Sequence, residues 1–143
     1  PFILDPGQNI VLFSGEQLLE MIDRAPVLVC NDYEAELICD KTGLTLAQLA
    51  ARVDTLIVTR GAEGSILWQK GTEHAIAPVP AAAVKDPTGC GDAYRAGLLY
   101  GIAAGFAQYH DGRFALRVDG EAENAHFYHG SPSRWAMRLC FLA

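Results

Sequence analysis

The sequence lacks the long apolar runs and the basic excess that would point to a membrane or to nucleic acid. No stretch of about 18 or more apolar residues occurs, so no segment is expected to span a bilayer and no membrane partner is expected. No basic stretch leads into an apolar one at the start, so no secretory signal is expected. The formal net charge of -6 argues against a nucleic-acid partner, which favours a basic surface.

The cysteines lack the spacing of a zinc site or a disulfide framework. Four are present, none is part of a C-x-x-C pair, and they are far apart in the sequence. Scattered free thiols suit a reducing compartment, so the chain is expected to be cytoplasmic.

Two common nucleotide-binding signatures are also missing. No G-x-x-x-x-G-K-[ST] sequence occurs, which excludes a P-loop NTPase. No G-x-G-x-x-G follows the first predicted strand, which argues against a dinucleotide-binding fold. Half of the residues are hydrophobic and a fifth are charged, as in an ordinary globular domain.

Short apolar runs alternate with helical stretches along the first hundred residues. The runs predict buried strands at Phe2–Asp5, Val27–Cys30 and Thr55–Thr59. Capping boxes predict helices that start at Ser14, Asn31 and Thr45, with Gln17, Glu34 and Gln48 as the third helical residues. A hairpin is predicted from Gly64–Trp68 and His74–Val79, with its turn near Lys70 and Gly71. This alternation predicts a mostly parallel sheet with helices on both faces.

The most informative stretch is Gly89-Cys90-Gly91-Asp92, at the start of a helix predicted from about Asp92 to Ala104. Small residues let the backbone aim several N–H groups at one point, and the helix N-terminus adds positive potential, which suits a phosphate. A carboxylate there repels a phosphate, so Asp92 is interpreted as a base that takes a proton from an attacking hydroxyl. The alternative is an ordinary turn followed by a favourable first-turn acid.

Three motifs in order resemble those of the ribokinase-like (PfkB) carbohydrate kinases. The segment from Asp86 to Gly97, DPTGCGDAYRAG, resembles the C-terminal motif of that family, although most members have Ala where this chain has Cys90. Asn31-Asp32-Tyr33-Glu34 resembles the family's Asn-x-x-Glu motif, and Val58–Ser65 resembles its nucleotide-side strand and turn.

The resemblance covers residues 1–105 and implies a fold and an activity. The implied fold is α/β, a ribokinase-like (Rossmann-like) three-layer αβα arrangement with a mostly parallel sheet, here incomplete and without the lid domain. The implied activity is ATP-dependent phosphoryl transfer to a hydroxyl of a sugar or nucleoside, with magnesium and, as a further candidate cofactor, a monovalent cation. The sequence Asp5-Pro6-Gly7-Gln8 resembles a feature of the branch that includes adenosine kinases.

The resemblance also implies roles for matching residues. Asp92 would be the general base, and the backbone amides of Gly89, Cys90 and Gly91 would form the anion hole. The remaining positions would serve the nucleotide: Asn31 and Glu34 at the phosphates and at magnesium (Glu34 through water), Thr59, Gly61 and Gly64 along the pocket, and Asp86 in support of the loop.

Each role has a structural alternative. Asn31 and Glu34 make a capping box like the two others in this chain. Gly61 and Gly64 could serve only to turn the chain between two strands. Cys90 is interpreted as a small wall residue, since no His or Lys lies nearby in sequence to activate it as a nucleophile.

Residues 106–143 form an atypical tail in which no strand or helix period is evident, and one hypothesis is a frameshift near Phe106. Family members are longer, and their N-terminal part binds the acceptor, so this chain alone is expected to have little kinase activity. Two alternatives are a non-catalytic nucleotide- or anion-binding remnant and a structural fragment that binds nothing. An exposed sheet edge would favour a homo-oligomer.

Overall fold

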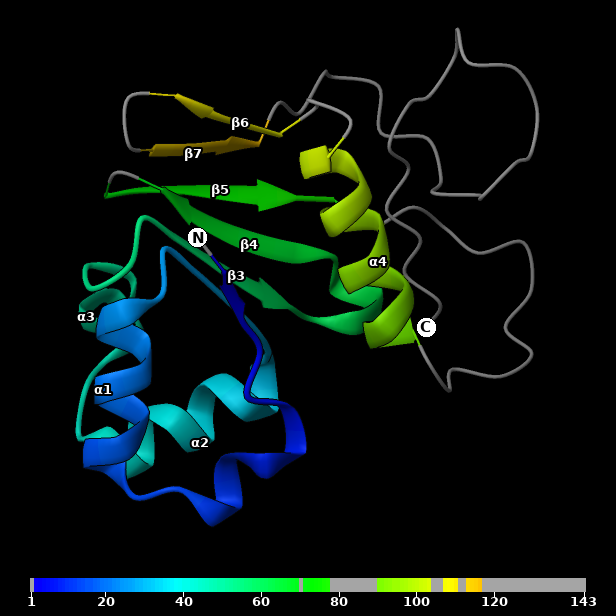
Figure 1. Cartoon of the computed structure of the whole chain (residues 1–143). Helices are drawn as coiled ribbons and strands as arrows, with labels where there is room; N and C mark the ends of the chain where they lie inside the picture. The colour runs from blue at the N-terminus through cyan, green and yellow to red at the C-terminus, as the bar shows by residue number, and fades with distance from the viewer. Residues whose placement is uncertain (1, 70, 78–89, 104–106, 111–112, 117–143) are drawn as a thin grey trace, which may run out of the picture. The chain divides into compact units, whose positions relative to one another are not determined.

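The computed structural model describes residues 2–69, 71–77, 90–103, 107–110 and 113–116. The chain divides into two structural units. The first consists of Pro1–Arg60 with Ser65–Ile76, and the second of Gly61–Gly64 with Ala77–Ala143. Figure 1 draws their helices and strands and labels most of them.

A five-stranded sheet forms the framework of the first unit. In spatial order its strands are β1 (Ile3–Leu4), β2 (Val27–Asn31), β3 (Thr55–Thr59), β4 (Ser65–Gln69) and β5 (Thr72–Ile76). β1, β2 and β3 are parallel, β4 pairs antiparallel with β3, and β5 pairs antiparallel with β4. The parallel strands and the hairpin were both predicted, although β5 begins at Thr72, two residues before the predicted start at His74. The predicted end of this arm, Val79, lies outside the described residues. At the hairpin turn Gly71 has a φ of 75°, which favours glycine.

Three helices lie in the connections between the parallel strands. They are α1 (Gly15–Arg24), α2 (Asp32–Thr42) and α3 (Leu46–Ala50), and a 3-10 segment, η1 (Gly7–Leu12), precedes them. All three begin with the predicted capping box, in which both reciprocal hydrogen bonds are present. Right-handed connections between successive parallel strands place their helices on one face of the sheet, so α1, α2 and α3 share a face.

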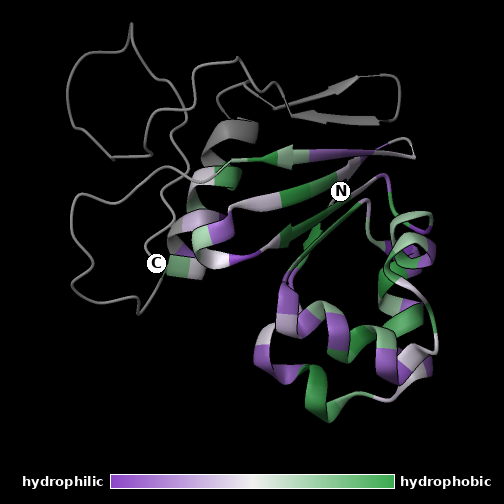
Figure 2. Ribbon diagram, turned by 180° about the vertical axis from the view of Figure 1, so that it is seen from behind, coloured by the Kyte–Doolittle hydropathy of each residue, from purple (hydrophilic) through white to green (hydrophobic). Residues whose placement is uncertain are grey.

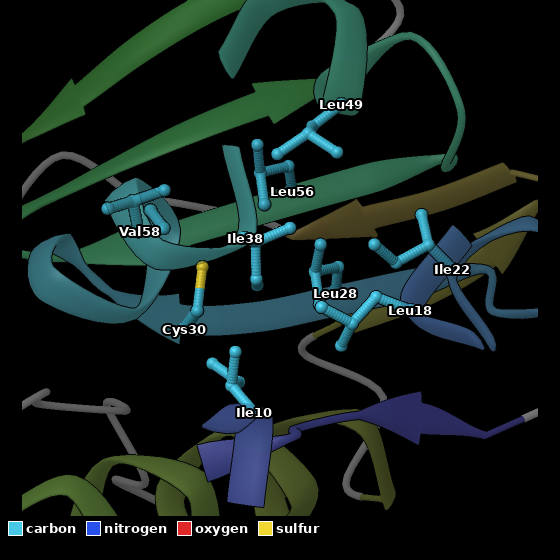
Figure 3. Packing of buried hydrophobic residues seen from close by; sticks show 10 residues of the cluster. Ile10, Leu18, Ile22, Leu28, Cys30, Ile38, Leu49, Leu56 and Val58 are labelled. Atoms are coloured by element: carbon cyan, nitrogen blue, oxygen red, sulfur yellow. The ribbon is translucent and has the colours of Figure 1, made fainter. Parts of the chain in front are cut away.

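The core of the first unit lies between that helical layer and the sheet. Figure 3 shows side chains from η1, the three helices and the two central parallel strands pointing toward one another. Its fully or nearly fully buried members are Ile10, Leu18, Ile22, Leu28, Cys30, Ala35, Ile38, Leu49, Leu56 and Val58. β2 and β3 are hydrophobic along most of their length, whereas the helices carry both hydrophobic and hydrophilic residues (Figure 2). Each large aliphatic side chain buried here contributes roughly 1.5–3 kcal/mol.

The first strand differs from the prediction of a buried strand over Phe2–Asp5. β1 has only two residues, both half-buried, and Phe2 is half exposed. The apolar run indicated a strand correctly, but it could not distinguish a short strand beside a single neighbour from a central one.

The second unit contains η2 (Gly61–Glu63), α4 (Cys90–Ala103), β6 (Ala107–His110) and β7 (Arg113–Leu116). α4 begins two residues before the predicted start at Asp92. β6 and β7 pair as antiparallel strands, so the expectation of no regular structure after residue 106 is wrong for these eight residues. The Asp111-Gly112 sequence between them is a hairpin signal that was overlooked. None of the described helices is long and apolar enough to cross a bilayer.

Candidate functional site

Two of the predicted site residues lie side by side at the carboxyl edge of the parallel strands. Asn31 is the last residue of β2 and Thr59 is the last residue of β3, and the two are register partners. Both are half-buried. Ligands of open α/β sheets bind beyond the carboxyl ends of the strands, so this edge is the expected place for a nucleotide site.

Asn31 and Glu34 are locked together by the capping box that begins α2. The backbone N–H of Glu34 donates to Oδ1 of Asn31 at 2.7 Å, and the N–H of Asn31 donates to Oε2 of Glu34 at 2.9 Å. Glu34 is buried, with 6% of its surface exposed. The box does not use the Nδ2 amide of Asn31 or the second carboxylate oxygen of Glu34, and those are the atoms that could meet a ligand.

The described residues suit a magnesium ion that is held mainly by water and by substrate phosphates. No cluster of three or more His, Cys, Asp or Glu side chains suitable for a metal occurs in the described part of the chain. Magnesium commonly keeps several waters and binds substrate phosphates with one or two carboxylates. The buried carboxylate of Glu34 fits such an ion as a partner of its water shell.

The first turn of α4 carries the other group of predicted residues. Cys90, Gly91 and Asp92 are its first three residues, and the first N–H groups of a helix are not used by its own hydrogen bonds. They therefore point outward at the positive end of the helix dipole, as an anion site requires. Gly89 and Asp86 lie outside the described residues.

Asp92 has a cationic neighbour that the sequence reasoning missed. Its side chain is 85% exposed, and Nη1 of Arg95 lies 3.0 Å from its Oδ1. A Cβ atom added at Gly91 would lie 3.0 Å from the same Nη1, so the guanidinium rests over Gly91. The spacing of three residues within a helix is the signal that could have predicted this ion pair.

The turn between β3 and β4 depends on its glycines. Gly61 has a φ of 52° and Gly64 a φ of 88°, and the N–H of Gly64 donates to the carbonyl of Gly61 at 3.1 Å. Left-handed backbone favours glycine at both positions. The alternative that these glycines turn the chain is therefore satisfied, and a contact with a nucleotide stays a prediction.

The thiols of the first unit are unsuited to nucleophilic chemistry. Burial, followed by the charge of Glu34, raises the pKa of Cys30 far above its usual range. Burial, followed by the charge of Asp40, also raises the pKa of Cys39. Since the thiolate is the reactive form, both side chains act as small core or boundary groups.

Comparison with known proteins identifies the family. Residues 7–117 match the family model described as pfkB family carbohydrate kinase. This chain belongs to the pfkB family. The nucleoside kinase of Methanocaldococcus jannaschii is 39% identical over 102 residues, which cover 71% of this chain and 34% of that relative.

Solved structures agree with this assignment. A nucleoside kinase from Burkholderia thailandensis in complex with inosine is 50% identical, has a TM-score of 0.70, and is matched over 72% of this chain and 34% of that one. The Methanocaldococcus jannaschii structure, described as an archaeal member of the ribokinase family, is 37% identical with a TM-score of 0.68, over 77% of this chain and 36% of that one. The chain has part of a ribokinase-like fold and spans about a third of the length of these relatives.

Proposed function

We propose that this chain carries the nucleotide-phosphate and catalytic end of an ATP-dependent kinase that phosphorylates a hydroxyl group of a nucleoside. The observation that carries the proposal is Asp92 in the first turn of α4, where outward N–H groups and a base occur within three residues. The similarity to a nucleoside kinase that binds inosine favours a nucleoside over other hydroxyl acceptors.

The proposed reaction uses Asp92 as the general base. Its carboxylate takes the proton of the acceptor hydroxyl as that oxygen forms a bond to the γ-phosphorus of ATP. The bond between that phosphorus and the bridging oxygen breaks, ADP leaves, and Asp92 returns its proton to solvent. The N–H groups of Cys90 and Gly91 would stabilise the negative charge on the transferring group, together with Gly89.

The carboxyl edge of the sheet has a separate proposed role. Asn31, through its amide, and Thr59, through its hydroxyl, would hydrogen-bond phosphate oxygens. Glu34 would orient waters of a magnesium ion, which when bound neutralises phosphate charge. Gly61 and Gly64 would line the nucleotide pocket, with Asp86 supporting the loop before α4, and a monovalent cation is a further candidate cofactor.

The length of the chain favours a second candidate function, a nucleotide-binding segment without turnover of its own. The chain spans about a third of its relatives, and phosphoryl transfer depends on a positioned acceptor. We therefore expect little kinase activity from the 143-residue chain and retained binding of magnesium-ADP.

Thermal unfolding of the chain with and without magnesium-ADP tests binding. At a nucleotide concentration of about 100 times Kd, a ligand that binds only the folded state adds about 2.7 kcal/mol to the free energy of unfolding. Asp92→Asn should bind magnesium-ADP nearly as well as the unchanged chain, as should the control Asp40→Asn on α2. An unfolding temperature that magnesium-ADP does not change would show that the chain is a structural fragment without a nucleotide site.

Four other expectations remain proposals: a cytoplasmic location, self-association, the domain boundary and the frameshift. Free thiols at the described cysteines support a reducing, cytoplasmic location, and self-association would be tested by sedimentation. The domain boundary at residues 105 and 106, and the frameshift near Phe106, would be tested by sequencing the coding DNA. A reading frame that is intact through Ala143 would reject the frameshift.

A further inference from the structure

Ser65 has an environment that its place in the sequence does not explain. It is the first residue of β4, directly after Gly64, and its surface is fully buried. Its Oγ has no hydrogen-bond partner among the described residues. Most buried polar side-chain atoms in native proteins are hydrogen-bonded, so an exception calls for an explanation such as a binding role.

The sheet places Ser65 in line with two residues of the candidate site. Asn31 pairs with Thr59 across β2 and β3, and Thr59 pairs with Ser65 across β3 and β4. Cys30 and Val58, the preceding residues on β2 and β3, belong to the core under the helices, so Asn31 and Thr59 point to the opposite face. Ser65, opposite Thr59, shares that face. The three polar side chains form a row along the carboxyl edge.

The other end of the same pair of strands shows what a structural polar pair looks like. Thr55 and Gln69 are register partners four residues away from Thr59 and Ser65, and so lie on the same face. There Nε2 of Gln69 donates to Oγ1 of Thr55 at 3.2 Å. At one end of this strand pair the polar side chains thus hydrogen-bond to each other, whereas at the other end the hydroxyl of Ser65 has no hydrogen-bond partner among the described residues.

We propose that Ser65 is a third phosphate-binding residue at this edge, and that its hydroxyl donates a hydrogen bond to a nucleotide phosphate oxygen, directly or through one water. This inference rests on the proposed function. Neighbouring strands lie about 4.8 Å apart, so the hydroxyls of Thr59 and Ser65 can reach one phosphate group. Thr59 is half-buried and marks the side from which the phosphate arrives. An uncharged hydroxyl can rotate to donate, as an anionic oxygen requires.

Two variants of the 143-residue chain test this, Ser65→Ala and the control Thr55→Val. Urea unfolding without nucleotide reports on the native partners of each hydroxyl. Ser65→Ala should leave the unfolding midpoint unchanged or raise it, because no native hydrogen bond is lost. Thr55→Val should lower the midpoint, because the side-chain nitrogen of Gln69 loses its acceptor. Titration with magnesium-ADP should then show about tenfold weaker binding for Ser65→Ala, and unchanged binding for Thr55→Val.

The outcomes separate the two proposals. A midpoint for Ser65→Ala as low as that of Thr55→Val would show that the hydroxyl has a structural partner, and would overturn the inference. Unchanged nucleotide affinity in Ser65→Ala, with normal binding by the unchanged chain, would overturn the inference and leave the proposed function standing. Absence of binding by the unchanged chain would overturn both.

Discussion

The capping box at Asn31 offers a way to separate a structural role from a binding role, because the chain contains matched controls. Replacing an N-cap side chain by Ala costs about 0.5–2 kcal/mol. The bond from the N–H of Glu34 to Asn31 is 2.7 Å, whereas that from Gln17 to the hydroxyl of Ser14 is 3.2 Å. Glu34 is also buried, so its N–H loses more when the cap is removed.

From these contacts we expect Asn31→Ala to lower the free energy of unfolding by about 1.5–2 kcal/mol, and Ser14→Ala by about 0.5–1 kcal/mol. Urea denaturation of both variants measures this difference. Asn31→Ser should restore most of the stability, since Ser caps as well as Asn, but it lacks the amide that would meet a phosphate. We therefore expect Asn31→Ser to bind magnesium-ADP about tenfold more weakly, and Ser14→Ala to bind normally.

The informative variant is Asn31→Ser, because it preserves the cap and removes only the amide. If Asn31→Ser binds magnesium-ADP with the affinity of the unchanged chain, Asn31 is a cap and nothing more. The proposed phosphate contact would then be refuted, whatever the stability measurements show.

Three further predictions concern stability. Gly15→Ala should lower the free energy of unfolding in urea by about 3 kcal/mol or more, because the new Cβ would collide with the carbonyl oxygen of Lys41. Gly43 has a φ of 70° and open space around it, so Gly43→Ala should cost only about 1–2 kcal/mol. Equal costs for the two variants would contradict the close packing at Gly15. The pKa of the Cys30 thiol is about 9.0 in the unfolded chain and is raised in the folded one, so its contribution to stability is constant below about pH 8. That contribution is lost as the pH rises above 9, by up to about 1.4 kcal/mol per pH unit. Urea unfolding between pH 7.5 and 10.5 should show a steeper loss of stability for the unchanged chain than for Cys30→Ala, and parallel slopes would contradict the burial of the thiol. Leu56→Ala should cost about 2–5 kcal/mol, measured in the same way, because the side chain is fully buried; a cost below 1 kcal/mol would contradict the core.

Local signals in the sequence predicted local structure well. The capping boxes at Ser14, Asn31 and Thr45 use a fixed spacing of three residues, and all three form as expected. The β-branched run Thr55–Thr59 is a buried strand. The position of β1 at one end of the sheet depends on which strands pair, which an apolar run alone does not encode.

The candidate site was predictable only in part. Asn31 and Thr59 were proposed from separate motifs, and their register pairing needed the structure. Ser65 was placed correctly in the predicted strand Gly64–Trp68 but was not proposed for the site, because its burial depends on residues distant in sequence. Arg95 was overlooked although its spacing from Asp92 is a simple helical one.

The most direct test of the central claim is turnover by a chimera. Residues 7–117 of this chain would replace the matching segment of the Burkholderia thailandensis nucleoside kinase, and phosphorylation of inosine from ATP would be measured. We predict that the chimera is active, that Asp92→Asn lowers kcat by about 100-fold to 10,000-fold with little change in nucleotide binding, and that Asp40→Asn has no effect. A folded chimera in which Asp92→Asn retains full kcat would contradict the assignment of Asp92 as the catalytic base.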